Sequence, residues 1–220
     1  MFPSRTHSIR SVLLVVAMVF VAVSGAMAGT ATSITGLYTT GTGTGSRDSN
    51  WLLSDGRRAY VVTSSVPGDW MDNTTSARWV SYSNNAQAYS SDAGTFSYTL
   101  KFRIDGTGTN PVSNVAITLA LAVDDSATIA VNGSSAGMTV SGWDRISTVT
   151  LNAGNSNFVL GENTITLTVS NSGRGATGLF VSSISGVVPE VGAWAPAVAA
   201  LGVFCWFRFF RGKRRFPAAV

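Results

Sequence analysis

The sequence predicts an all-β fold, a single antiparallel β-sandwich or jelly roll, with a signal helix before it and a transmembrane helix after it. Three observations lead to this prediction. Apolar and polar residues alternate at period two in several stretches, most clearly over residues 95–104. Clusters of Asn, Asp and Gly separate these stretches. No stretch between the two ends of the chain shows a helical period of useful length.

The expected strands share one apolar face each, and burying these faces requires two packed sheets. The strands are expected, in chain order, over residues 59–64, 95–104, 114–123, 128–131, 146–151, 164–170 and 178–184. Four clusters with turn chemistry are expected to join them: Asp105-Gly106, Asn132-Gly133, residues 152–154 and residues 161–163. Seven or eight antiparallel strands are therefore expected.

The N-terminal segment has the features of a secretory signal peptide. Two arginines precede an apolar run over residues 12–23, which is followed by small residues at the positions that signal peptidase reads. We therefore expect a signal peptide over residues 1–28, cleaved between Ala28 and Gly29; the alternative is an N-terminal anchor. A lead-in rich in Gly, Thr and Ser follows over residues 29–46 and is expected to supply at most one edge strand.

The C-terminal segment has three parts. Val188, Pro189 and Glu190 precede an apolar run over residues 191–207, and five cationic residues follow that run. Seventeen helical residues span roughly 25 Å, slightly less than a hydrocarbon core of about 30 Å. The run therefore predicts a transmembrane helix, and the cationic residues place the chain's end, residues 216–220, in the cytoplasm.

The whole tail, residues 188–215, resembles the PEP-CTERM sorting signal of Gram-negative bacteria. The usual family pattern is Val-Pro-Glu-Pro, and Val191 stands here in place of the second proline. The resemblance implies export to the cell surface, processing by an exosortase, and anchoring in the inner membrane that is only transient. A simple C-terminal anchor is the alternative.

Subtracting both ends changes the composition of the chain. The whole chain has a formal charge of +4, but residues 29–190 hold 8 of its basic and all 11 of its acidic residues, for a net charge of −3. This balance excludes the nucleic-acid partner that the basic chain might imply. The single histidine and cysteine, His7 and Cys205, lie in the two end segments. A His-dependent or Cys-dependent nucleophile and a Cys/His zinc site are therefore excluded from the body.

A second resemblance covers residues 47–187, which are expected to form the β-sandwich domain. It rests on a series of loose motifs: Asn50-Trp51, residues 59–62, Trp70 with Asn73, Ser76 with Trp79, residues 122–125, residues 131–133 and residues 177–179. This series resembles modules that often precede such sorting tails, and those modules are similar to galactose-binding-domain-like β-sandwiches. The resemblance implies binding of an extracellular polysaccharide.

Four residues in expected loops are candidates for contacting such a ligand. Trp70 follows a Pro-Gly-Asp sequence and is expected to point outward, and Trp143 is expected to offer a second indole. Indole rings suit the C–H faces of sugars. Asp144 and Arg145 are candidates for polar contacts, although a surface ion pair explains them equally well. The two other indoles of the body are expected to close the ends of the core: Trp51 and Trp79.

Asp124 and Asp125 are expected between two strands, where adjacent like charges repel each other. Calcium would neutralise them with oxygen ligands alone, and the pair resembles the Asp-Asp of calcium-dependent lectin domains in adhesins. The alternative is a solvated turn in which the carboxylates cap backbone N–H groups. No other cofactor is expected.

These observations together predict an exported, non-enzymatic protein of the cell surface or extracellular matrix that binds polysaccharide. One alternative is a structural matrix protein without a discrete ligand site. The other is a carbohydrate-active enzyme that uses Asp124 and Asp125. The second alternative is disfavoured because adjacent residues of an extended strand point to opposite faces.

Overall fold

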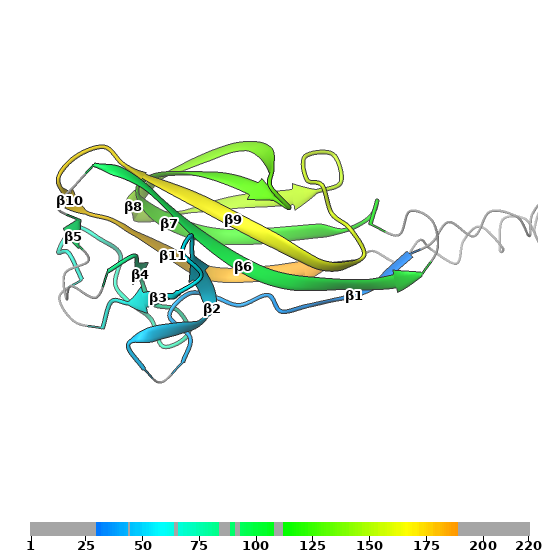
Figure 1. Ribbon diagram of the computed structural model, residues 1–220, viewed down its shortest axis with the longest axis horizontal. Helices are drawn as coiled ribbons and strands as arrows, with labels where there is room; N and C mark the ends of the chain where they lie inside the picture. Colours follow the sequence, from blue (N-terminus) through cyan, green and yellow to red (C-terminus); the bar gives the residue numbers. More distant parts are fainter. Residues whose placement is uncertain are drawn as a thin grey trace, which may run out of the picture.

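The computed structural model describes residues 30–43, 45–63, 66–83, 89–90, 93–107 and 112–188. These residues form strands and loops with no helix among them, which confirms the all-β class (Figure 1). Within these ranges no helix is long and apolar enough to cross a membrane. The predicted signal helix, the Ala28/Gly29 cleavage site, the Pro189-Glu190 motif and the transmembrane helix lie outside the described residues.

Eleven strands form within the described residues: β1 (Thr30–Thr35), β2 (Arg47–Leu53), β3 (Arg58–Val61), β4 (Val80–Ser81), β5 (Tyr89–Ser90), β6 (Gly94–Thr107), β7 (Ala116–Val131), β8 (Ser134–Asn152), β9 (Gly161–Asn171), β10 (Gly175–Ala176) and β11 (Gly178–Val187). The lead-in supplies β1 alone, and β1 pairs with the end of β6. β5 and β10 form a separate two-stranded ladder.

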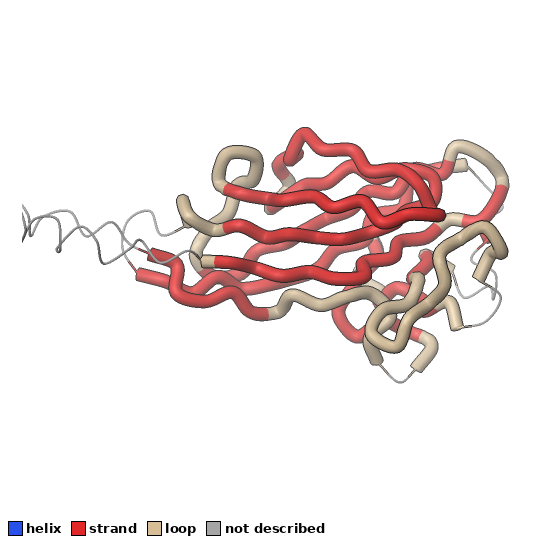
Figure 2. Tube along the Cα trace, turned by 180° about the vertical axis from the view of Figure 1, so that it is seen from behind, coloured by secondary structure: helices blue, strands red, loops and turns tan. Residues whose placement is uncertain are grey.

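The other strands form one continuous antiparallel system. β9 pairs with β6 along its whole length and with the second half of β7. On the other side of β6, the short strands β2, β3 and β4 lead to β11, which pairs with the first half of β7. The pairings thus return to their starting strand and enclose the core between two layers (Figure 2).

The β7–β8 ribbon passes from one layer to the other. Residues 116–124 of β7 pair with β11, whereas residues 126–131 pair with β9. β8 accompanies β7 through this change, with register irregularities on both sides of Ser126. Irregularities of this kind bend a strand. We call this bend, at Asp124-Asp125 of β7 and Gly142-Trp143 of β8, the corner.

The structure corrects three of the predicted turns. Asp124-Asp125 lie inside β7, which continues through the predicted break. Asp105-Gly106 lie inside β6, where they pair with β1. Residues 161–163 begin β9 and pair with β6. At Asp105-Gly106 and at residues 161–163 a partner strand satisfies the backbone that the local sequence alone would turn.

The turn at Asn132-Gly133 is confirmed. It joins β7 and β8, and its two residues have φ angles of 50° and 78°. Positive φ at both central positions is the geometry of a type I′ turn, for which Asn-Gly is the preferred sequence. The turn predicted at residues 152–154 is also present, after β8.

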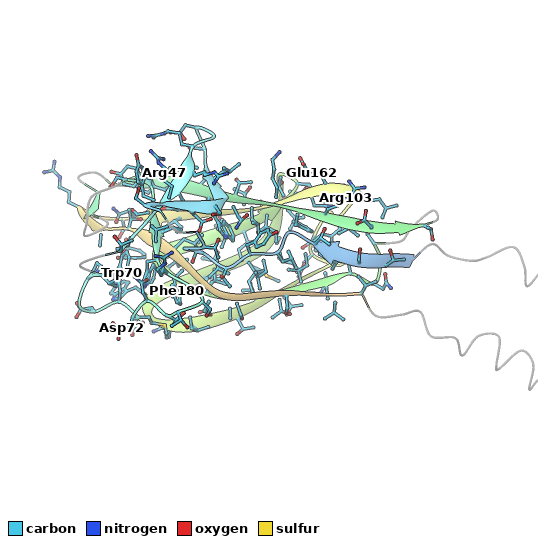
Figure 3. The ribbon with its side chains drawn as sticks, turned by 90° about the horizontal axis from the view of Figure 1, so that it is seen from below. Arg47, Trp70, Asp72, Arg103, Glu162 and Phe180 are labelled. Carbon is cyan, nitrogen blue, oxygen red and sulfur yellow. The ribbon has the colours of Figure 1, made fainter. Side chains whose placement is uncertain are left out.

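Two apolar clusters stabilise the fold. The larger lies between the layers and contains the alternating side chains of β6, β7 and β9, together with Trp51, which is fully buried. The smaller covers the outer face of β7 and β11 and contains Val62, Trp70, Ala77, Trp79, Ala122 and Phe180. Figure 3 shows Trp70 and Phe180 close together, away from Arg47 on the opposite side. The predicted burial of Trp51 and Trp79 is confirmed.

Candidate functional site

Six residues named from the sequence lie together at the corner, and we call them the corner site: Trp70, Asp124, Asp125, Trp143, Asp144 and Arg145. Three segments bring them there. The loop after β3 supplies the first, the bend of β7 supplies the two carboxyl groups, and the bend of β8 supplies the last three. The backbone N–H of Met71 donates to the carbonyl of Trp143 over 2.9 Å and joins the loop to β8.

The prediction that Trp70 points outward is wrong. Its side chain is 7 % exposed, and its ring centroid lies 4.1 Å from that of Trp79. Gly178 lies against the ring so closely that a Cβ atom there would be 2.8 Å from the Trp70 Cη2 atom. The indole is therefore a packing element of the smaller cluster and offers no stacking face.

The loop folds back over this ring because its polar residues bond to the loop itself. The Asn73 amide donates to the carbonyl of Val62 over 2.8 Å and accepts from the backbone N–H of Trp79 over 2.7 Å. The Trp79 indole donates to the carbonyl of Met71 over 2.7 Å. The polar sequence that predicted exposure thus serves to close the loop.

The carboxyl groups of Asp124 and Asp125 lie close enough for each to shift the pKa of the other. The Trp70 Nε1–H donates to Asp124 Oδ2 over 2.8 Å. The backbone N–H and the hydroxyl of Ser172 donate to Asp125 Oδ2 over 2.7 and 2.6 Å. The hydroxyl of Thr177 donates to the backbone carbonyl of Asp124 over 3.0 Å. The corner is thus bound to the loop after β3 and to the segment after β9.

The two carboxyl groups differ in their affinity for protons. Burial, and next the hydrogen bond and charge of Asp125, raise the pKa of Asp124 to about 7, although the Trp70 N–H opposes this shift. Burial also opposes ionisation of Asp125, but the hydrogen bonds from Ser172 and Asp124 outweigh it and lower the pKa of Asp125. Between about pH 4 and pH 7 Asp124 therefore keeps its proton while Asp125 is ionised.

Asp124 and Asp125 do not point to opposite faces of β7, as adjacent residues of a regular strand would. The bend of β7 brings both carboxyl groups to the same place. Retaining glycosidases hold two carboxyl groups about 5 Å apart and inverting ones farther apart, on either side of the bond that is cleaved, whereas Asp124 and Asp125 are neighbours at one bend of β7.

Calcium at Asp124 and Asp125 stays a prediction. The described residues contain no group of three or more Asp, Glu, His or Cys side chains placed to hold a metal ion. One oxygen of each carboxyl group already accepts a hydrogen bond, from Trp70 and from Ser172. Calcium takes six to eight oxygen ligands, so most of them would have to come from other groups.

Trp143 is the tryptophan of the corner site that remains available to a ligand. Its ring is half-buried against the smaller cluster. The indole N–H groups of the three other described tryptophans donate to protein acceptors: that of Trp51 to the carbonyl of Tyr38, that of Trp70 to Asp124, and that of Trp79 to the carbonyl of Met71. The Trp143 N–H makes no hydrogen bond within the described part of the chain.

Asp144 and Arg145 directly follow Trp143 in β8, and their charged groups lie against Gly142. Their side chains are 60 % and 66 % exposed, and Arg145 Nη1 lies 3.5 Å from Asp144 Oδ1. An ion pair this exposed contributes little to stability. Its donors and acceptors therefore remain accessible to a ligand at small energetic cost.

The sequence analysis missed two residues of this region, Ser172 and Thr177. Ser172 bonds the carboxyl group of Asp125, and Thr177, which is fully buried, bonds the backbone of Asp124. Both lie about fifty residues from the aspartates, and no sequence motif links them. Only the return of the chain from β9 to β11 brings them to the corner.

The comparisons with known proteins give distant structural resemblances. No family model and no curated protein matches the chain. A solved carbohydrate-binding module, TmCBM61 in complex with β-1,4-galactotriose, is 16 % identical, with a TM-score of 0.39 over 64 % of this chain and 89 % of that one. The CBM35 module of Cellvibrio japonicus Abf62 is 15 % identical, with a TM-score of 0.34 over 73 % of this chain and all of that one. Resemblances this distant assign no function.

Proposed function

We propose that this protein binds polysaccharide through the corner site. The observation that carries the proposal is the state of Trp143, whose ring is half-buried and whose N–H is unengaged within the described residues, next in sequence to the exposed Asp144 and Arg145. An indole offers an apolar face to the C–H groups of a sugar ring and a donor at its edge. The charged neighbours offer donors and acceptors to the hydroxyl groups.

Isothermal titration with a panel of matrix polysaccharides tests this proposal. Replacing Trp143 by alanine is expected to weaken binding about tenfold or more, because the stacking face and the indole donor are both lost. Tyr38→Ala is the matched control, since Tyr38 is an exposed aromatic residue (46 %) outside the corner site. Absence of heat with every polysaccharide would favour a structural matrix protein without a ligand site.

The proposed activity is non-enzymatic. The described residues contain neither histidine nor cysteine, and Asp124 and Asp125 are neighbours at one bend of β7 rather than on either side of a bond to be cleaved. A screen for polysaccharide hydrolysis is expected to stay blank with both the native protein and Asp125→Asn. Hydrolysis by the native protein that Asp125→Asn abolishes would revive the enzymatic alternative.

We also propose that the protein is exported and is sorted by an exosortase. The support is in the sequence: an apolar run followed by small residues at the N-terminus, and the motif, apolar run and basic residues at the C-terminus. The intact mass of the protein released from the cell surface tests this. A mass matching residues 29 to about 190 is expected, and a mass that still includes residues 191–220 would contradict processing of the tail.

A further inference from the structure

A shallow depression that is widely open to solvent, with a volume of about 540 Å³, lies far from the corner site, between the start of β8 and the loop that joins β8 to β9; we call it the hollow. The loop follows Asn152, whose partner across the ladder is Ala116. Ala116 and the corner residue Asp124 lie at opposite ends of the first half of β7, about 26 Å apart at the rise of a strand. In Figure 1 the loop is the yellow-green curl, at the end away from β5 and β10.

The lining of the hollow is polar and uncharged. Its polar side chains are hydroxyl and amide groups, and its other residues are alanine and glycine; the polar ones are Ser134, Ser135, Asn155, Ser156 and Asn157. A surface without charge gains nothing from an ionic ligand, and one without large apolar side chains gains little from an apolar ligand. Its chemistry suits a neutral ligand that is rich in hydroxyl groups.

One wall of the hollow is fixed to the other by Asn132. Its amide nitrogen donates to the carbonyl of Asn157 and to Asn163 Oδ1, both over 2.8 Å, and its amide oxygen accepts from the N–H of Thr164 over 2.8 Å. Asn163 is 1 % exposed and in turn donates to the carbonyls of Val159 and Gly161. A buried amide network thus clamps the turn after β7 to the loop before β9.

The loop that forms the other wall is fixed from within. The amide oxygen of Asn155 accepts from the N–H of Asn152 over 2.8 Å, and its amide nitrogen donates to the carbonyl of Thr150 over 3.0 Å. The amide oxygen of Asn152 accepts from the N–H of Gly154 over 2.8 Å. A loop held in this way loses little further freedom when a ligand binds.

Two lining side chains remain unengaged. Neither the hydroxyl of Ser134 nor the amide of Asn157 makes a hydrogen bond to another described residue. They come from the two opposite walls. Gly137 adds open space, since a Cβ atom there would meet nothing within 4 Å. The hollow therefore combines fixed walls with free donors and acceptors that face a common space.

We propose that this hollow is a second carbohydrate site, which takes a short neutral stretch of polysaccharide. Its volume lies in the range of roughly 300–1,000 Å³ of small-ligand sites. The inference extends the proposed function to residues that the corner site does not share. With one site near each end, a single domain bridges two polysaccharide chains.

Residue-resolved NMR titration of the full chain, in a detergent without a sugar headgroup, tests the inference. The probes are neutral trisaccharides of glucose, galactose and mannose, with trigalacturonate as the charged comparison. At least one neutral probe is expected to shift the backbone amides of Gly137 and Gly154. Trigalacturonate is expected to leave both amides unchanged.

Paired variants separate the two sites. The double variant Ser134→Ala with Asn157→Ala is expected to weaken binding at the Gly137 and Gly154 reporters about tenfold, without changing the Trp143 indole response. Ser141→Ala, on the exposed face of β8 outside the hollow, is the control. Trp143→Ala is expected to leave the hollow response intact, even if the corner site proves inactive.

Three outcomes overturn the inference. The first is that no neutral probe shifts the two glycine amides. The second is that trigalacturonate binds the hollow as tightly as a neutral probe does. The third is that the double variant binds like the native protein while retaining its melting temperature.

Discussion

Asp124 is the residue at which the chemistry and the architecture of the corner meet. It accepts the Trp70 indole N–H, lies beside the carboxyl group of Asp125, and its backbone carbonyl accepts the Thr177 hydroxyl. Its raised pKa follows from this position, because burial and the neighbouring carboxylate both disfavour a second negative charge. The stability of the corner therefore depends on pH.

The sign of this dependence follows from the proton balance. Between about pH 4 and pH 7 the folded chain keeps the Asp124 proton and the unfolded chain releases it, so the free energy of unfolding falls as the pH rises through this window. Asp125 acts in the opposite sense, and the stability it adds is lost only as the pH falls below its ordinary pKa of 3.8.

Asp124→Asn isolates the first effect, because asparagine keeps an acceptor for Trp70 and a donor for Asp125 but carries no proton to lose. The variant is expected to match the native melting temperature at pH 5 and to exceed it by about 3–6 °C at pH 8. Thermal melts at both pH values measure this. Equal pH dependence of the two proteins would contradict a proton kept on Asp124.

Gly178 shows how closely the smaller cluster is packed. A Cβ atom there would lie 2.8 Å from Trp70 Cη2 and 3.0 Å from the carbonyl of Val80, and neither the buried ring nor the backbone has room to move. Gly178→Ala is expected to lower the free energy of unfolding by about 1–3 kcal/mol. Gly173→Ala, where a Cβ atom meets nothing within 4 Å, is the control. Denaturant titration that finds the two variants equally stable would contradict this packing.

Of the tryptophans whose burial was predicted from the sequence, some are placed as expected and one is not. Trp51 and Trp79 are buried as expected, Trp51 in the larger cluster and Trp79 in the smaller one. The expectation that Trp70 points outward was wrong, because its polar neighbours bond to their own loop and close it instead of facing water. Local polarity therefore predicted the loop correctly and the direction of its central side chain wrongly.

At the scale of elements, alternation was the reliable signal. Residues 95–104 form the centre of β6, with Phe102 and Ile104 buried and Lys101 and Arg103 exposed. Each strand predicted by period two is present, because a half-buried strand must place one kind of side chain on each face. The bend of β7 at Asp124-Asp125 was not predictable, because two adjacent carboxylates are typical of a turn. The strand continues there because β7 pairs with β11 before the bend and with β9 after it.

Asp48 holds the segment after β1 to β2, a role that no sequence motif indicates. Its carboxyl group is fully buried and accepts from the backbone N–H groups of Gly41, Thr42, Asn50 and Trp51. A buried carboxyl with four backbone donors replaces the pairing that this irregular segment lacks.

The free energy of unfolding of Asp48 variants is expected to fall with the number of side-chain acceptor oxygens that are lost. Asp48→Ala leaves all four N–H groups without their acceptor and is expected to cost about 3 kcal/mol or more. Asp48→Asn keeps one accepting oxygen and is expected to lie between alanine and the native protein. Urea unfolding of the three proteins measures the order. An alanine variant as stable as the native protein would show that water or other groups satisfy these donors.

At the scale of the whole molecule, the two ends of the domain carry different kinds of side chain. The corner site combines a half-buried indole with charged groups, whereas the hollow at the other end is lined by neutral hydroxyl and amide groups. β11 starts at the corner, where Gly178 pairs with Asp124, and ends beside Ala116 at the far end. β11 thus runs from the corner to the opposite end of the domain (Figure 1).

The central claim is that carbohydrate binds at Trp143. Its most direct test is to follow the indole N–H resonances of the protein during titration with an oligosaccharide of the polysaccharide that it binds. The Trp143 resonance is expected to shift with ligand concentration, because no acceptor among the described residues engages its N–H. The resonances of Trp51, Trp70 and Trp79 are expected to stay in place, since protein acceptors hold them. Saturable binding that leaves the Trp143 resonance unmoved would contradict the account.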